Sequence, residues 1–389
     1  MITEVQKQNL SILSDALFSA GALTAIKESE VEAIIREACA QAVFPLVAGK
    51  IPKLSEPLKM QMNAAVMQNF KITYEHRRLH ELLTDSKIPY VILKGCASAS
   101  WYSDPILRAM GDVDILVNEC DYERAGELLE SNGYAREEDH GGVHTAFMHN
   151  GTICELHRSI NGIPGCACGE RVRGYLADII DTAVDGETPC GAVRIPNAFH
   201  HGLVMLLHTA SHLTAEGIGL RHLCDWAVFA NKVDVAQWQA ELQSCGLWEF
   251  ARMLTLLSVK YLGMPEKPWA GEADAEVLAG LMDDIFTGGN FGHKDEDRPQ
   301  QIKYISNRGE KTVDSKGVIR QAWDTIGKKA AAEDKTRFGV LLSYGAMVLR
   351  GQRKPDSGKM ISEANQRKKL YAELHLFEVS AEKKSTPNG

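Results

Sequence analysis

The sequence contains no long apolar run. A membrane-spanning helix needs about 20 consecutive apolar residues, and no stretch of this chain approaches that length. Residues 1–18, MITEVQKQNLSILSDALF, form an amphipathic pattern without the basic region and cleavage motif of a signal peptide. We therefore expect a protein with no membrane partner and a cytoplasmic location.

Paired cysteines and an excess of positive charge are also missing. The nine cysteines are scattered, and a chain of 389 residues can build its core without disulfides. Cys166 and Cys168 lie close together but lack the second pair that completes a zinc site. The formal net charge of −8 gives no overall basic surface for nucleic acid. We expect reduced thiols and no overall basic surface for nucleic acid, while a local basic groove stays open.

The chain divides into three regions by sequence pattern. Residues 1–88 and 197–389 carry helical periodicity, whereas residues 89–196 alternate between strand and helix patterns. We predict an α+β fold, a small mixed-sheet core flanked by N-terminal and C-terminal helical regions. Residues 288–317 are rich in glycine and charge, which predicts a long, flexible loop. The expected helices are 3–20, 28–46, 56–86, 199–213, 218–231, 235–262, 273–287, 318–350 and 358–379.

Strand patterns are concentrated in the central region. YVIL (90–93) and DVDILV (112–117) are short apolar runs, and GAVRIP (191–196) is a further candidate. VHTAFMH and TICELHRSI are separated by Asn150-Gly151, a pair typical of a two-residue hairpin turn. A helix is expected between the second strand and this hairpin.

Two aspartates interrupt the second strand. Asp is unfavourable within strands, yet Asp112 and Asp114 flank Val113 in this apolar run. Side chains two residues apart share one face, about 6.5–7 Å apart, so the carboxylates project together and repel unless a cation lies between them. Mg²⁺ is commonly held by one or two carboxylates and substrate phosphates. Taken alone, the pair is explained equally well by a structural role.

A third carboxylate stands on the hairpin. Glu155 occupies a strand position with Ile153 and His157 on its face. If this strand lies beside residues 112–117, three carboxylates converge.

Groups suited to phosphate precede the two aspartates. Lys94-Gly95 ends a strand and opens an expected helix, where free backbone N–H groups favour an anion. Gly95 permits close approach of the backbone, and Ser98 adds a hydroxyl group. Lys94 and Arg108 can neutralise phosphate charge.

The order of these motifs resembles the polymerase-beta-like nucleotidyltransferase superfamily and, within it, a bacterial family of uncharacterised nucleotidyltransferases. That family has K-G, then Y-x-x-P-x-x-R-x-x-x-D-x-D before apolar residues, then acid-x-His on a later strand. HHGLVMLLHTASHL and GLRHLCDWAVF are similar to its histidine-rich helix and R-x-x-x-D motif, and the resemblance spans about residues 90–230. The matching residues are Lys94, Gly95, Tyr102, Pro105, Arg108, Asp112, Asp114, Glu155, His157, His208, His212, Arg221 and Asp225.

The resemblance implies a metal-dependent nucleotidyltransferase. A nucleoside monophosphate would pass from a nucleoside triphosphate to an acceptor hydroxyl or phosphate, with release of pyrophosphate. Asp112, Asp114 and Glu155 would be the catalytic residues and hold Mg²⁺ or Mn²⁺. A small molecule is favoured as acceptor over a protein or RNA. The remaining site residues divide into phosphate-binding groups (Lys94, Gly95, Ser98, Arg108) and acceptor-side or structural groups (His157, His208, His212, Arg221, Asp225).

Two other functions stay open. His200, His201, His208 and His212 could bind a transition metal for phosphohydrolase chemistry, with His208 and His212 one helical turn apart. The chain could also be a catalytically degenerate nucleotide-binding scaffold. For Arg221 and Asp225, likewise one turn apart, the structural alternative is a buried ion pair that joins the helical region to the core.

Overall fold

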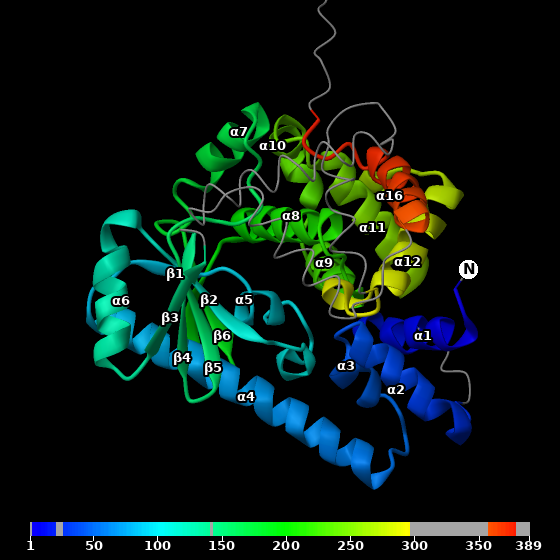
Figure 1. Cartoon of the computed structure of the whole chain (residues 1–389), viewed down its shortest axis with the longest axis horizontal. Coiled ribbons are helices and arrows are strands. Elements are labelled where there is room, and N and C mark those ends of the chain that lie inside the picture. The colour runs from blue at the N-terminus through cyan, green and yellow to red at the C-terminus, as the bar shows by residue number, and fades with distance from the viewer. Residues whose placement is uncertain (1, 21–25, 141–142, 296–356, 379–389) are drawn as a thin grey trace, which may run out of the picture.

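The computed structural model describes residues 2–20, 26–140, 143–295 and 357–378. It shows an α+β protein in which helices flank a five-stranded mixed sheet (Figure 1). The fold class predicted from the sequence is confirmed. The helix expected at 318–350, and all of the predicted loop beyond residue 295, lie outside the described residues.

The sheet places β2 and β5 side by side at its centre. They are parallel, whereas the other neighbouring strands are antiparallel. The edge strand β3 was not predicted, because AREEDH has no apolar alternation. The predicted strand at 191–196 is present, but it pairs with β6 in a separate two-stranded sheet. Across the main sheet the order is β1 (Tyr90–Ile92), β2 (Asp112–Val117), β5 (Thr152–His157), β4 (His144–His149) and β3 (Ala135–His140), and the second sheet has β6 (Val184–Thr188) and β7 (Gly191–Ile195).

The predicted hairpin joins β4 to β5. Asn150 and Gly151 both have positive φ, 50° and 72°, which is the conformation of a type I′ turn. This turn matches the twist of the strands and fixes their register, with His144 opposite His157. The hairpin thereby determines which side chains of β5 face each side of the sheet.

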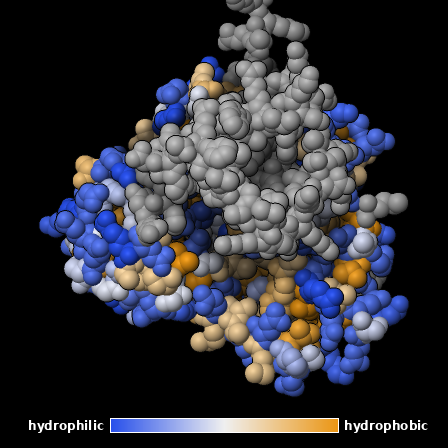
Figure 2. Space-filling model, in the orientation of Figure 1, coloured by the Kyte–Doolittle hydropathy of each residue, from blue (hydrophilic) through white to orange (hydrophobic). Residues whose placement is uncertain are grey.

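One face of the sheet packs against α4 (Glu56–Asp85) and α6 (Tyr122–Ser131), which run below and to the left of it in Figure 1. Val113, Ile115 and Val117 of β2 are buried in this sheet core, as the alternation predicted. Ile72, Leu79 and Leu83 from the C-terminal half of α4 join the same cluster. The outer surface over α6 is largely hydrophilic (Figure 2), as expected for an amphipathic helix.

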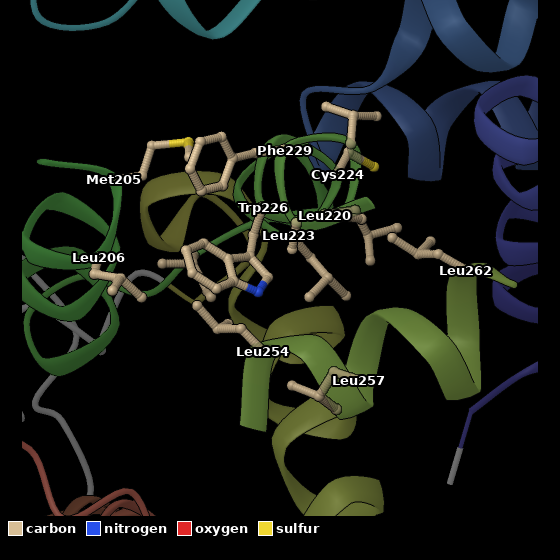
Figure 3. Close-up of a cluster of buried hydrophobic side chains, with 14 of the residues drawn as sticks. Met205, Leu206, Leu220, Leu223, Cys224, Trp226, Phe229, Leu254, Leu257 and Leu262 are labelled. Carbon is tan, nitrogen blue, oxygen red and sulfur yellow. The ribbon is translucent and has the colours of Figure 1, made fainter. Parts of the chain in front are cut away.

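A second, helical core combines both ends of the described chain. α1 to α3 share one hydrophobic cluster with α8, α9, α11, α12 and α16. Figure 3 shows its centre, where Trp226 and Phe229 of α9 pack near Met205 of α8 and Leu254 of α11. The division at residues 88 and 196 stays a prediction. These helices are α1 (Glu4–Phe18), α2 (Val31–Ala40), α3 (Phe44–Ala48), α8 (Ala198–Thr214), α9 (Leu220–Lys232), α11 (Trp248–Leu262), α12 (Ala275–Gly288) and α16 (Ser357–Ala372).

Two long predicted helices are broken in the structure. Residues 28–46 contain an interruption at Ala42, which has φ 54°, and residues 235–262 are interrupted at 245–247. The apolar spacing continues across both breaks because the segments on either side pack against the same core. The remaining short helices are α5 (Cys96–Ala99), α7 (Ala167–Leu176), α10 (Gln239–Ser244), and the 3₁₀ turns η1 (Glu28–Glu30), η2 (Pro105–Leu107), η3 (Glu119–Asp121), η4 (Val235–Trp238), η5 (Pro268–Ala270) and η6 (Asn290–Gly292).

Within the described residues, no helix combines the length and apolarity needed to cross a lipid bilayer.

Candidate active site

Asp112 and Asp114 lie on the face of the sheet opposite α4 and α6. The pleat of β2 places the two carboxylates together, while Val113 and Ile115 point into the sheet core. The side chain of Asp114 is only 1% exposed. A carboxylate at that depth requires compensation by cations or hydrogen-bond donors.

Glu155 joins the two aspartates through strand pairing. In the parallel β2–β5 ladder Asp114 is directly opposite Glu155, so both side chains project from the same face. One oxygen from each of Asp112, Asp114 and Glu155 can be chosen so that all three lie within 4.8 Å of one another. The convergence anticipated from the hairpin pattern is present in the structure.

Lys94 and His157 supply the compensation for Asp114. Lys94 Nζ lies 2.9 Å from Asp114 Oδ1, and His157 Nε2 lies 3.2 Å from the same oxygen and 3.2 Å from Glu155 Oε2. Burial alone would raise the pKa of Asp114, but Lys94 and His157 together lower the pKa well below its usual range. Repulsion from Asp114, followed by burial, instead raises the pKa of Asp112 to about 6.

The three carboxylates fit a divalent cation. Their oxygens are the hard ligands that Mg²⁺ and Mn²⁺ prefer, and their mutual separation matches shared coordination. Asp114 Oδ2 is buried and has no hydrogen-bond partner among the described residues. An unsatisfied carboxylate oxygen inside a protein is costly, and coordination of a cation would satisfy it.

A second candidate metal group shares Glu155. His144, Glu155 and His157 also offer ligand atoms within 4.8 Å of one another. The His144 and His157 rings lie 4.9 Å apart between centroids, and His144 Nε2 is 3.7 Å from Glu155 Oε1. The carboxylate group and the histidine-containing group are therefore adjacent on one face of the sheet, with Glu155 common to both.

Gly95 and Ser98 lie beside the carboxylates. Gly95 has φ 54°, and a Cβ at this position would lie 2.7 Å from His76 Nε2, so only glycine fits. The helix that follows, α5, is present as predicted but has only four residues, Cys96–Ala99. Gly95 and Ser98 both line the cavity described below. Their predicted contact with phosphate stays a prediction.

Arg108 is paired with Asp225 and also lines the cavity described below, and its predicted contact with phosphate stays a prediction. Arg108 Nε and Nη2 donate to Asp225 Oδ1 and Oδ2 at 2.8 and 2.7 Å, and the Tyr102 hydroxyl donates to Oδ1 at 2.7 Å. Sequence spacing offered Arg221 as the partner of Asp225, and the structure shows Arg108 in that role. A bidentate pair satisfies a deeply buried guanidinium better than a contact along one helix. As anticipated for the structural alternative, a buried pair joins α9 to the segment before β2.

These residues surround a cavity of about 440 Å³. We call one side the sheet wall, formed by Lys94, Asp112, Asp114, His144 and Glu155. We call the other side the helical wall, formed by His208, His212, Arg221, His222 and Phe291. The cavity volume is in the range of sites for small ligands.

The sequence was compared with models of known families. A model described as an uncharacterised nucleotidyltransferase matches residues 23–263. The chain belongs to this family. The family supports a general role in nucleotidyl transfer, and the resemblance noted from the motifs is confirmed. No curated protein matches the chain.

The nucleotidyltransferase match covers the whole sheet wall and most of the helical wall. Of the helical-wall residues, only Phe291 lies outside residues 23–263. Helices α12 and α16 also lie beyond the match. They are tied together by Arg367 and Tyr371, which donate to Asp284 at 2.9 and 2.6 Å.

The four histidines of α8 do not converge in the structure. His200 Nε2 bonds the Tyr175 carbonyl at 2.8 Å, and His201 packs against Trp101. His208 and His212 line the cavity, where burial lowers the pKa of both. Among the described residues, no group of three potential metal ligands includes an α8 histidine. The geometry gives the predicted histidine-rich phosphohydrolase centre no support.

Three of the residues that form the sheet wall and the helical wall were not singled out from the sequence. His144 could have been found from the hairpin register, which places it opposite His157. His222 follows Arg221 directly, but a histidine within an apolar helix gives no sign of its surroundings. Phe291 lies in the glycine-rich segment predicted to be a loop, and it is brought to the cavity by the η6 turn.

Proposed function

We propose that this protein transfers a nucleoside monophosphate from a nucleoside triphosphate to an acceptor hydroxyl or phosphate. The observation that carries the proposal is the convergence of Asp112, Asp114 and Glu155 within 4.8 Å on the wall of a 440 Å³ cavity. Like charges are held this close in enzymes that displace at phosphorus, because two cations about 3.5–4 Å apart bridge them. Membership of a nucleotidyltransferase family supports the same chemistry.

The residues divide the work as follows. Asp112, Asp114 and Glu155 would hold Mg²⁺ or Mn²⁺, which when bound neutralises phosphate charge and activates the acceptor oxygen. Lys94 balances the buried Asp114. His157 Nε2 positions Glu155 by contacting its Oε2 at 3.2 Å. The other oxygen, Oε1, lies on the side of His144 and would receive the proton of the acceptor hydroxyl.

The bond changes are those of an in-line displacement. The acceptor oxygen forms a bond to the α-phosphorus while the bond from that phosphorus to the oxygen leading to the β-phosphorus breaks, and pyrophosphate leaves. Alignment and charge neutralisation supply most of the acceleration. The cavity size favours a small-molecule acceptor over a protein or RNA, and a triphosphate donor agrees with the predicted cytoplasmic location.

Incubation with each α-labelled triphosphate, Mg²⁺ and cell extract tests the proposal. Wild type is expected to form a labelled product that the Asp112→Asn/Asp114→Asn variant does not form. Glu127→Gln is the matched control, because Glu127 is an exposed acid on α6 on the other side of the sheet. Absence of labelled product from the wild type with every nucleotide would contradict the proposal.

The wild-type protein also allows a test of the alternative function, a nucleotide-binding scaffold without catalysis. Mg²⁺-dependent nucleotide binding without pyrophosphate release, measured by thermal shift and a pyrophosphate assay, would indicate a nucleotide-binding scaffold.

A further inference from the structure

The cations around the cavity are not equivalent. Lys94 is paired with Asp114 at 2.9 Å, and Arg108 is bound through two nitrogens to Asp225. Arg221 lines the same cavity but has no ion pair with a carboxylate among the described residues. Its charge is therefore the least compensated of the three.

Arg221 also has unused hydrogen-bonding capacity. Its Nε is buried without a hydrogen-bond partner in the described part of the chain, and its guanidinium lies 5.3 Å from the centroid of the Phe291 ring. Burial and the neighbouring Arg108 lower the pKa of Arg221, as expected for a cation with too little negative charge around it. Guanidinium groups in such surroundings bind planar or tetrahedral oxyanions through parallel N–H donors.

The adjacent histidine adds a neutral donor. Neither His222 Nδ1 nor His222 Nε2 has a partner among the described residues, and both are buried. Burial, followed by the charge of Arg221, lowers the pKa of His222 well below its usual value, so the ring stays neutral. His208, whose ring centroid lies 5.5 Å from that of His222, borders the same space.

The two walls consequently differ in charge. On the sheet wall three carboxylates face one ammonium group, whereas on the helical wall the charge of Arg221 faces no bonded carboxylate. A negative wall opposite a positive wall matches a cation bound to a phosphate-bearing substrate. We infer that Arg221, with His222 and His208, forms a phosphate-binding subsite on the helical wall. The inference rests on the proposed function only in one respect, the identity of the substrate that supplies the phosphate. Binding of an oxyanion at the subsite requires no nucleotidyl transfer.

Binding of inorganic pyrophosphate, measured by calorimetry without nucleotide, tests the subsite. Arg221→Met is expected to weaken binding at least tenfold. Arg36→Met is the matched control, since Arg36 is exposed on α2, and it should bind as the wild type does. His222→Phe should weaken binding by a smaller factor. Equal pyrophosphate binding by wild type and Arg221→Met would overturn the inference, whether or not the protein transfers nucleotides.

Chemical labelling of the wild-type protein tests the inference even if Arg221→Met does not fold. Phenylglyoxal modifies accessible guanidinium groups, and peptide mass spectrometry locates the modification. Pyrophosphate should reduce labelling of Arg221 several-fold and leave Arg36 unchanged. Undiminished labelling of Arg221 at saturating pyrophosphate would overturn the inference.

The source of the phosphate follows from a competition. Inorganic phosphate is titrated into protein saturated with Mg²⁺ and a triphosphate analogue that has a methylene group between the α- and β-phosphorus atoms. If phosphate still binds with the analogue present, and this binding requires Arg221, the subsite belongs to a phosphorylated acceptor. Loss of phosphate binding with the analogue present assigns it to the triphosphate of the donor.

Discussion

Asp112 and Asp114 acquire different properties from their surroundings although they are two residues apart. Asp114 has Lys94 and His157 on one oxygen, whereas Asp112 receives mainly the repulsion of its neighbour. The pKa of Asp114 is lowered and that of Asp112 is raised to about 6. The two carboxylates should therefore have opposite effects on stability when no metal is present.

We expect Asp112→Asn to stabilise the metal-free protein and Asp114→Asn to destabilise it. The pKa of Asp112 is higher in the folded state, so its ionisation costs stability as pH rises from about 4 to 6. At pH 8 with chelator, Asp112→Asn should raise the free energy of unfolding by on the order of 1–3 kcal/mol. Asp114→Asn should lower it, because Lys94 and His157 lose their partner. Urea unfolding measures both changes, and a loss of stability in Asp112→Asn would contradict the argument.

His201 should make the protein acid-sensitive. It is 1% exposed, neither ring nitrogen has a partner among the described residues, and burial lowers its pKa to about 4. As pH falls from 6.5 to about 4, the unfolded chain binds a proton at His201 that the folded protein does not, so stability falls. His201→Phe should reduce the loss between pH 7 and 4.5 by on the order of 2 kcal/mol. Denaturant unfolding of both proteins at the two pH values measures this, and equal losses would contradict it.

At the scale of elements, the hairpin determines where Glu155 points. A shift of one residue in β5 would turn Glu155 into the sheet core and bring Cys154 to the cavity face. The register depends on a turn in which Asn150 and Gly151 both have positive φ. Glu75 on α4 supports the hairpin from outside the turn, since His149 Nδ1 lies 3.0 Å from its carboxylate.

Gly151→Ala tests that dependence. Alanine at φ 72° is strained, and its Cβ would lie 3.2 Å from Lys71 Nζ, so the free energy of unfolding should fall by about 1–2 kcal/mol. Gly165→Ala is the control, because its Cβ would have no neighbour within 4 Å. Mn²⁺ affinity, measured by calorimetry, should fall with the first variant and not with the second. Unchanged stability and affinity in Gly151→Ala would show that the turn does not control the register.

Local sequence patterns predicted the strands and the turn that carry the site. They could not predict contacts between residues far apart in the sequence. The alternation in β2 and the Asn-Gly turn were sufficient to place Asp112, Asp114 and Glu155 on a common face once the strands were neighbours. The partner of Asp225 was predicted incorrectly, because helical spacing identifies Arg221 but carries no information about Arg108 from another segment. The strand β3 lacked an apolar pattern, since an edge strand can be formed by polar residues.

At the scale of the whole molecule, the buried pair of Arg108 and Asp225 connects the sheet to the helices. Asp225 lies on α9 within the helical core, and Arg108 immediately precedes the segment that leads into β2. The Tyr102 hydroxyl completes the network. The pair therefore ties the segment before β2 to α9, which carries Arg221 and His222 of the helical wall.

Removing one charge of this pair should lower the free energy of unfolding more than removing both charges. Asp225→Asn leaves the Arg108 guanidinium buried without a counter-charge, which should cost about 3–5 kcal/mol in the free energy of unfolding. Arg108→Met/Asp225→Leu removes both charges and should recover a large part of that loss. Urea unfolding of Arg108→Met, Asp225→Leu and the double variant gives the coupling free energy. A double variant less stable than Asp225→Asn would contradict a compensated pair.

The cavity lies where two hydrophobic cores meet, so substitutions in the helices can act separately from substitutions in the sheet. The carboxylates stand on strands stabilised by one core, and the histidines of α8 and α9 stand on helices stabilised by the other. Substitutions that reshape the helices can leave the three carboxylates in place. Under the proposed function, a lineage with this architecture can thus acquire a new acceptor while it inherits its chemistry unaltered.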